Sequence, residues 1–179
     1  MNETRLNLGL AKSKLENEEG LNYLRIAWNS FGPAGKAFLR IELPSGVKRK
    51  PNLSGFEEDA DGRIFIHEPD AADELLIEIY TDEAVPAGRT TIVVELAYAD
   101  APTAFRFVKR EIDLEIAAAE EALDGLIIDE EVVNKMSELG SPADDRNLRV
   151  DAFYDPIRKR RLPLRSENPG STRNVLIEA

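Results

Sequence analysis

The chain has 179 residues, 42% of them hydrophobic and 32% charged, which is typical of a globular domain and excludes a disordered or membrane-embedded class. Its formal net charge of -11 argues against general binding to nucleic acid or anionic lipid, because both are polyanions. The absence of cysteine excludes disulfides, thiolate chemistry and Cys-based zinc sites.

Segments in which apolar and polar residues alternate follow one another through the first two thirds of the chain. They are separated by short stretches that contain Gly, Pro or Asp, which end strands and form turns. The predicted strands span residues 5–10, 23–31, 36–43, 63–68, 74–80, 90–100 and 105–116. Seven short strands at this spacing predict a mainly β fold, an Ig-like antiparallel β-sandwich over residues 1–117.

The last predicted strand changes phase along its length. Phe105 and Phe107 fall on one face, whereas Ile112, Leu114 and Ile116 fall on the other. We therefore expect a β-bulge near residues 108–109, which would bend the strand.

Residues 118–179 differ in composition from the sandwich. Asp129 is a good N-cap for a short acidic helix that ends at Leu139, before Gly140. A basic loop follows, and residues 148–154 and 172–179 have strand-like patterns. This extension either packs on the sandwich or forms a small subdomain, and the sequence leaves both open.

A family resemblance covers about residues 20–100. The segments NSFGPAGKAFLRIELPSGV (29–47), IFIHEPDAADELLIEIYTDE (64–83) and VPAGRTTIVVELAYAD (85–100) resemble the conserved repeat domain of bacterial cell-surface proteins. The resemblance implies an Ig-like sandwich that acts as a structural spacer or adhesive module, without catalytic residues. The matching residues are turn formers and strand apolars, so they concern geometry and not chemistry.

The sharpest local motif is EEDADGRIFIHE, residues 57–68. In the calcium-loop template, the ligand positions fall on Glu57, Asp59, Asp61, the carbonyl of Arg63, and Glu68. Against calcium, the first ligand is Glu where Asp is usual, and no flanking helix is expected beside Pro51 and Pro69. The alternative is a hairpin turn whose acidic side chains are solvated. No other cofactor and no catalytic residue is predicted.

Three further candidates each have a structural alternative. His67 is expected at the surface, since nothing in the sequence places a nucleophile or an orienting acid beside it. Trp28, Phe105 and Phe107 would suit a carbohydrate-binding face, yet Trp28 alternates with Leu24 and Ile26 as a core residue does. The basic cluster 157–161 could contact phosphates or an acidic partner, but it lacks interleaved aromatics.

The sequence thus favours a non-enzymatic structural or protein-interaction module of a bacterial or phage assembly. Its partner is another protein or a second copy, joined through sheet edges or residues 172–179. The alternative is a small module that binds calcium or carbohydrate. Neither membrane insertion nor a signal peptide is expected from the apolar runs or the first residues. A full-length chain would be cytoplasmic, and part of a larger precursor or assembly would belong to a cell surface or virion.

Overall fold

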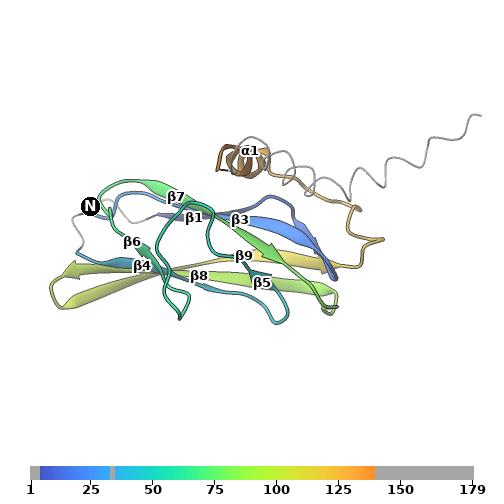
Figure 1. Cartoon of the computed structure of the whole chain (residues 1–179), viewed down its shortest axis with the longest axis horizontal. Coiled ribbons are helices and arrows are strands. Elements are labelled where there is room, and N and C mark those ends of the chain that lie inside the picture. Colours follow the sequence, from blue (N-terminus) through green and yellow to red (C-terminus); the bar gives the residue numbers. More distant parts are fainter. Residues whose placement is uncertain (1–4, 33–34, 140–179) are drawn as a thin grey trace, which may run out of the picture.

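The computed structural model describes residues 5–32 and 35–139. These residues form two stacked β-sheets with one helix above them (Figure 1). The elements are β1 (Leu6–Leu10), β2 (Lys14–Glu16), β3 (Leu21–Trp28), β4 (Ala37–Glu42), β5 (Lys48–Arg49), β6 (Ile64–Ile66), β7 (Asp73–Tyr80), β8 (Gly88–Ala101), β9 (Ala104–Ala117) and α1 (Glu130–Leu139). In this part of the chain no helix is long and apolar enough to cross a membrane.

The strand order confirms the predicted fold class. One sheet has the order β1-β3-β7-β5 and the other the order β2-β9-β8-β4-β6. All pairs are antiparallel except β2 with β9, which run parallel. The orders β1-β3-β7-β5 and β9-β8-β4 correspond to the two sheets of an Ig-like sandwich. The β-containing C-terminal extension that we predicted lies outside the described residues.

The core lies between the sheets and follows the period-two pattern of the strands. Leu24 of β3 is paired with Ile77 of β7, and neither side chain is exposed to solvent. Trp28 is 3% exposed and packs edge-on against Phe56, with 5.6 Å between ring centroids. The structure therefore confirms that Trp28 is a core residue. Its indole Nε1 is buried and has no hydrogen-bond partner among the described residues.

Helix α1 covers the outer face of the four-stranded sheet (Figure 1). Its N-cap is Asp129, as predicted: Oδ1 accepts hydrogen bonds from the backbone N–H groups of Glu131 at 3.0 Å and Val132 at 3.3 Å. Val132 is fully buried, and it sits so close to Gly9 of β1 that a Cβ there would lie 3.1 Å from its Cγ2. The lack of a side chain on Gly9 thus lets the helix approach the sheet.

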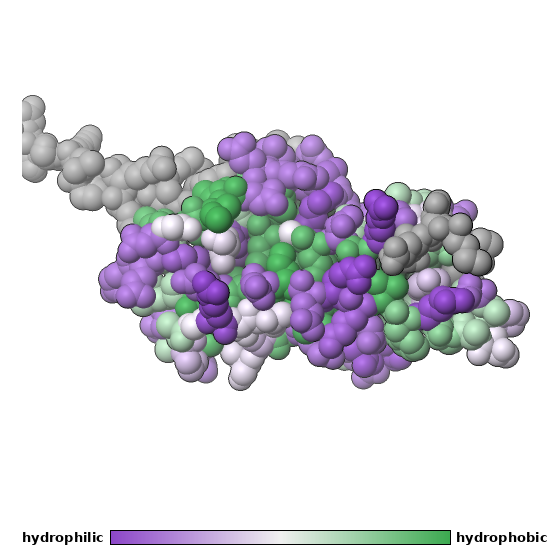
Figure 2. Space-filling model, turned by 180° about the vertical axis from the view of Figure 1, so that it is seen from behind, coloured by the Kyte–Doolittle hydropathy of each residue, from purple (hydrophilic) through white to green (hydrophobic). Residues whose placement is uncertain are grey.

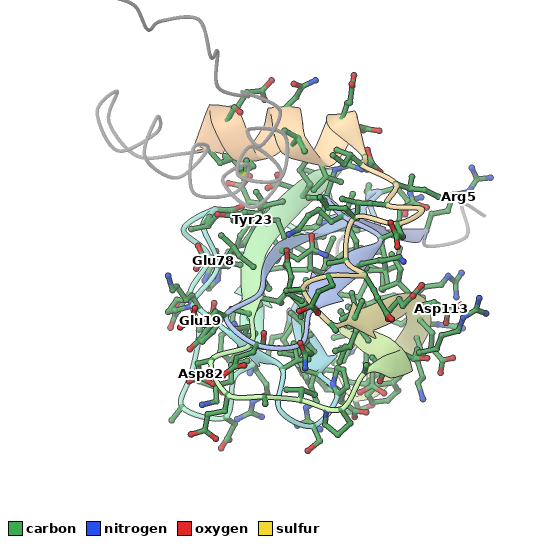
Figure 3. All side chains as sticks on the ribbon, turned by 90° about the vertical axis from the view of Figure 1, so that its right-hand side faces the viewer. Arg5, Glu19, Tyr23, Glu78, Asp82 and Asp113 are labelled. Carbon is green, nitrogen blue, oxygen red and sulfur yellow. The ribbon has the colours of Figure 1, made fainter. Side chains whose placement is uncertain are left out.

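A polar pair is buried beneath this helix. The Tyr23 hydroxyl donates a hydrogen bond to Glu78 over 3.3 Å, and the two side chains point toward each other in Figure 3. Lys50 forms a 2.5 Å ion pair with the other carboxylate oxygen of Glu78, so the buried charge is compensated.

The predicted division of the chain at residue 117 stays a prediction, because residues 140–179 lie outside the described part.

The expected bulge near residues 108–109 is wrong. The β8–β9 register is regular from Gly88 opposite Ile116 to Ala99 opposite Phe105, and the irregularity lies between Ala99 and Ala101 beside the turn. The change of phase has another cause. The even-numbered residues of β9, Val108 included, face the inside of the sandwich as far as the β8–β9 turn. Phe105 and Phe107 are odd-numbered and lie on the outer face, where they are exposed.

Candidate functional site: the free edge of strand β9

Strand β9 is an edge strand over most of its length. The pairing of β2 with β9 covers only residues 115–117, because the chain at residues 11–13 passes from one sheet to the other. Within the described ranges no strand pairs with residues 104–113 on the side away from β8. We call residues 104–113 the β9 edge. Such an edge offers backbone donors and acceptors to another strand.

The hydrogen bonds at the covered end show which backbone groups point outward. On the β2 side, the Glu115 N–H donates to the Ser13 carbonyl and the Ala117 carbonyl accepts from Asn17. In an antiparallel pair the bonding direction alternates along the strand. The N–H and C=O groups of residues 105, 107, 109, 111 and 113 therefore point away from β8. Arg110 Nη1 donates to the Lys109 carbonyl over 2.9 Å.

The side chains of the odd-numbered residues lie on the outer face of the five-stranded sheet. Phe107 is 62% exposed and Phe105 is 47% exposed. The register places Phe65, Phe38, Ala97 and Phe107 in one row across the sheet. Phe38 and Phe65 are in ring contact, with 6.4 Å between centroids. An aromatic strip thus crosses the sheet and ends at the β9 edge.

Three cations lie on the β9 edge in an otherwise acidic protein. Arg106, Lys109 and Arg110 are all exposed. The hydrogen bond from Arg106 to Asp100, at 2.5 Å, raises the pKa of the guanidinium, so Arg106 stays charged. Lys109 lies 3.7 Å from Glu111. Charges on an edge strand discourage pairing with most other strands, so these cations restrict which strand this edge accepts.

Hydrophobic surface lies between the edges β1 and β9, on one side of the sandwich. Leu8 of β1 and Val108 and Ile112 of β9 pack against the core but are only partly buried. Figure 3 places Arg5, which precedes β1, and Asp113 of β9 on the same side of the molecule. Figure 2, the view from behind, shows a band of hydrophobic surface between the upper and lower layers. The described residues therefore cover this side of the sandwich incompletely.

A hollow of about 390 Å³ adjoins the aromatic strip. Phe38, Phe65 and Phe105 line it together with Lys36, Arg63 and His67. Arg63 lies over the Phe38 ring at 5.8 Å from its centroid. The hollow brings together an aromatic floor and cationic side chains, so it favours groups that combine an apolar surface with negative charge.

The acidic loop has the geometry of a turn held by an arginine. The Asp59 carboxylate accepts backbone hydrogen bonds from Asp61 and Arg63, at 3.0 and 2.9 Å, and lies 2.7 Å from Arg63 Nε. Arg63 also pairs with Asp61, at 3.1 Å. The backbone hydrogen bond from Arg63 is the largest of the contacts that lower the pKa of Asp59. The arginine therefore occupies the region toward which these carboxylates point.

Two further expected calcium ligands have other partners. Glu57 Oε2 lies 3.1 Å from His67 Nε2, and both side chains are 68% exposed, which agrees with a surface histidine. The Arg63 carbonyl, the expected backbone ligand, accepts a hydrogen bond from the Asp59 N–H at 3.1 Å. Among the described residues no three acidic, histidine or cysteine side chains are grouped so that they could hold a metal ion. This geometry favours the hairpin turn, and the calcium site stays a prediction.

Calorimetry with calcium distinguishes the two interpretations of the loop. We expect no heat of binding in the wild-type chain, because Arg63 already neutralises Asp59 and Asp61. The control is the double substitution Asp59→Ala with Asp61→Ala. Heat that is present in the wild type and lost in this variant would establish a calcium site.

The sequence located part of this surface. It singled out Phe105 and Phe107 as aromatics for a binding face, and both are exposed, whereas Trp28 is buried and unavailable to a ligand. It missed Phe38 and Phe65, whose place in the same row as Phe107 depends on a register between distant strands. The out-of-phase phenylalanines were a usable signal for an uncovered face. The basic cluster 157–161 lies outside the described residues.

Comparisons with known proteins give only remote similarities. No protein-family model and no curated protein matches the chain. Among solved structures, the major pilin subunit of Bacillus cereus aligns with 8% identity and a TM-score of 0.48, over 64% of this chain and 41% of the pilin. The Salmonella SafD adhesin aligns with 10% identity and a TM-score of 0.39, over 64% of this chain and 99% of the adhesin. AvmM, which catalyses macrocyclization in alchivemycin A biosynthesis, aligns with 10% identity and a TM-score of 0.37, over 62% of this chain and 89% of AvmM. At this level no function carries over to this chain.

Proposed function

We propose that the chain is a non-enzymatic structural or protein-interaction module. It binds another protein when a strand of that protein adds to the β9 edge. The observation that carries the proposal is the edge of residues 104–113, which no strand of residues 5–32 or 35–139 pairs with on the side away from β8 and which includes the exposed Phe105 and Phe107. Main-chain hydrogen bonds supply affinity in strand addition, and alternate side chains supply specificity.

Both faces of an added strand would find contacts. On the outer face its side chains would lie beside Phe105, Phe107 and Lys109. On the inner face they would cover the partly buried Leu8 and Val108 between the two sheets. Burial of apolar surface contributes about 25 cal/mol per Å², so the uncovered side of the sandwich rewards such an addition.

A cell-surface or virion assembly stays a prediction from the sequence. Residues 172–179, which we predicted as a second place for strand addition, lie outside the described part. The calcium or carbohydrate alternative also stays a prediction, with the hollow beside Phe38 and Phe65 as the place for an anionic sugar.

A proline on the edge tests the proposal. The Lys109 N–H points away from β8, so Lys109→Pro removes a donor for an incoming strand without removing a hydrogen bond of the β8–β9 ladder. We expect wild-type mass to rise with concentration in light scattering, and the proline variant to stay monomeric with its β circular dichroism unchanged. The matched control, Lys109→Ala, removes the charge but keeps the N–H, and should still associate. Equal association of the proline variant and the wild type would place the contact elsewhere and refute the proposal.

A further inference from the structure

The β9 edge is complementary to itself in one register. We infer that two copies of this chain pair their β9 strands antiparallel about a two-fold axis at Phe107, which joins the two five-stranded sheets into one. The inference rests on the proposed function and specifies its partner. It follows from the direction of the edge hydrogen bonds, the order of charges along residues 104–113, and the place where β2 begins.

Two-fold symmetry allows only some registers for a pair of antiparallel β9 strands. A two-fold axis normal to the sheet keeps both inner faces on the same side, so an odd-numbered residue faces an odd-numbered one. The outward backbone groups belong to the odd-numbered residues, so every such register forms hydrogen-bonded pairs. The registers differ in the residue that lies on the axis, and side-chain pairing distinguishes them, because like charges directly opposite each other are destabilising.

Five registers place one of residues 106–110 on the two-fold axis, and four of these bring like charges opposite each other. With Arg106, Lys109 or Arg110 on the axis, that residue faces its own copy. With Val108 on the axis, Arg106 faces Arg110 twice. An axis at residue 111 would oppose two glutamates, and an axis at residue 105 would leave only about five residues paired before the hairpin turn at residues 102–103. The register centred on Phe107 therefore remains.

The Phe107 register also makes favourable contacts. Phe107 faces the partner's Phe107, and Phe105 of each copy lies diagonal to it, so four aromatic rings gather on the outer face. Phe105 faces the aliphatic stem and ammonium group of Lys109, and Ala104 faces Arg110. The three central pairs of odd-numbered residues would exchange about six backbone hydrogen bonds.

The length of the exposed edge fits this arrangement. In the Phe107 register, residue 111 faces residue 103 of the second copy, where the partner's hairpin turns. The incoming strand therefore ends before Glu115, whose outer side is occupied by β2 and by the ion pair with Lys14, at 3.3 Å. Pairing in this register displaces no strand of the sandwich.

Disulfide cross-linking tests the register, since the native chain has no cysteine. Ala104 and the partner's Arg110 would face each other with Cα atoms about 4.5 Å apart, within the range of disulfides. A mixture of Ala104→Cys and Arg110→Cys chains should form the mixed disulfide dimer under mild oxidation. Either variant alone should not, because its two cysteines would be about 20 Å apart. Both variants keep the two phenylalanines and Lys109.

A second pair of variants tests the aromatic contact at the axis. Phe107→Asp places two carboxylates opposite each other and should weaken dimerisation about tenfold or more, which corresponds to the loss of one aromatic pair and a gain of repulsion. The control is Ile127→Asp, which changes another exposed apolar side chain, 70% exposed and outside β9, and should dimerise like wild type.

The outcomes separate this inference from the proposed function. Association that is lost in Lys109→Pro but gives no mixed disulfide would overturn the register and leave strand addition standing. A disulfide of Arg110→Cys with itself would also overturn it, since it indicates an axis at residue 110. A monomeric wild type at every concentration would overturn the dimer, whether the edge stays bare or is filled by residues 172–179.

Discussion

Replacement of Leu24 by alanine is expected to lower the free energy of unfolding by about 3 to 5 kcal/mol, the upper part of the range for buried leucines. Leu24 is not exposed at all, and it faces the core from the central strand β3, opposite Ile77. Strands β1 and β7 flank β3 and limit how far the backbone can move into the cavity that the substitution leaves. Urea unfolding followed by the fluorescence of the single tryptophan, Trp28, measures the change.

The same substitution at another leucine separates burial from chemistry. Leu139 is the last residue of α1 and is 37% exposed. Leu139→Ala should change stability by less than about 0.5 kcal/mol, as is usual for surface substitutions. Similar losses for Leu24→Ala and Leu139→Ala would contradict the position of Leu24 in the core.

The second large effect is expected at Gly20, between β2 and β3. A Cβ on Gly20 would overlap the carbonyl oxygen of Glu16 and lie 2.9 Å from its backbone nitrogen. Thr81 holds this turn from the other side: its hydroxyl accepts from Gly20 N–H at 2.9 Å and donates to the Glu16 carbonyl at 2.8 Å. Gly20→Ala must therefore move backbone that is fixed by hydrogen bonds, and it should cost about 3 kcal/mol, the upper end for overpacking.

A matched glycine provides the control for Gly20. Gly35 has open space around its Cβ position and no left-handed backbone conformation. Gly35→Ala should leave the thermal midpoint within about 2 °C, whereas Gly20→Ala should lower it by about 10 °C or more for a domain of this size. A Gly20→Ala protein with the wild-type midpoint would show that the turn is not held as described.

Local patterns in the sequence predicted the parts of the fold that depend on near neighbours. The alternation around Leu24 predicted a buried strand, and Asp129 predicted the start of α1, because each signal lies within a few residues of its effect. Strands β2 and β5 were missed, since three and two residues are too few to show a period. The expected β-bulge near residues 108–109 was wrong for a different reason: the change of phase marks a stretch of outer face where Phe105 and Phe107 are exposed, and the sequence could not show this.

The candidate site shows the same limit. The sequence recognised the acidic spacing around Asp59 but gave no weight to Arg63 as a competitor for the carboxylates, four residues away. Among the described residues, β2 leaves the β9 edge unpaired because residues 11–13 cross between the sheets just before it. That crossing is a property of the topology, and no residue within 104–113 encodes it.

The parallel pairing of β2 with β9 also determines how the sandwich responds to tension. When the chain before β2 and the chain after β9 are drawn apart, the two strands slide along each other. Their hydrogen bonds, which include those from Glu115 N–H to the Ser13 carbonyl and from Asn17 N–H to the Ala117 carbonyl, would then be loaded together and not one by one. A peeling geometry would rupture at a much smaller pull. The short strand β2 is therefore expected to be loaded in shear when the two ends of the sandwich are pulled apart.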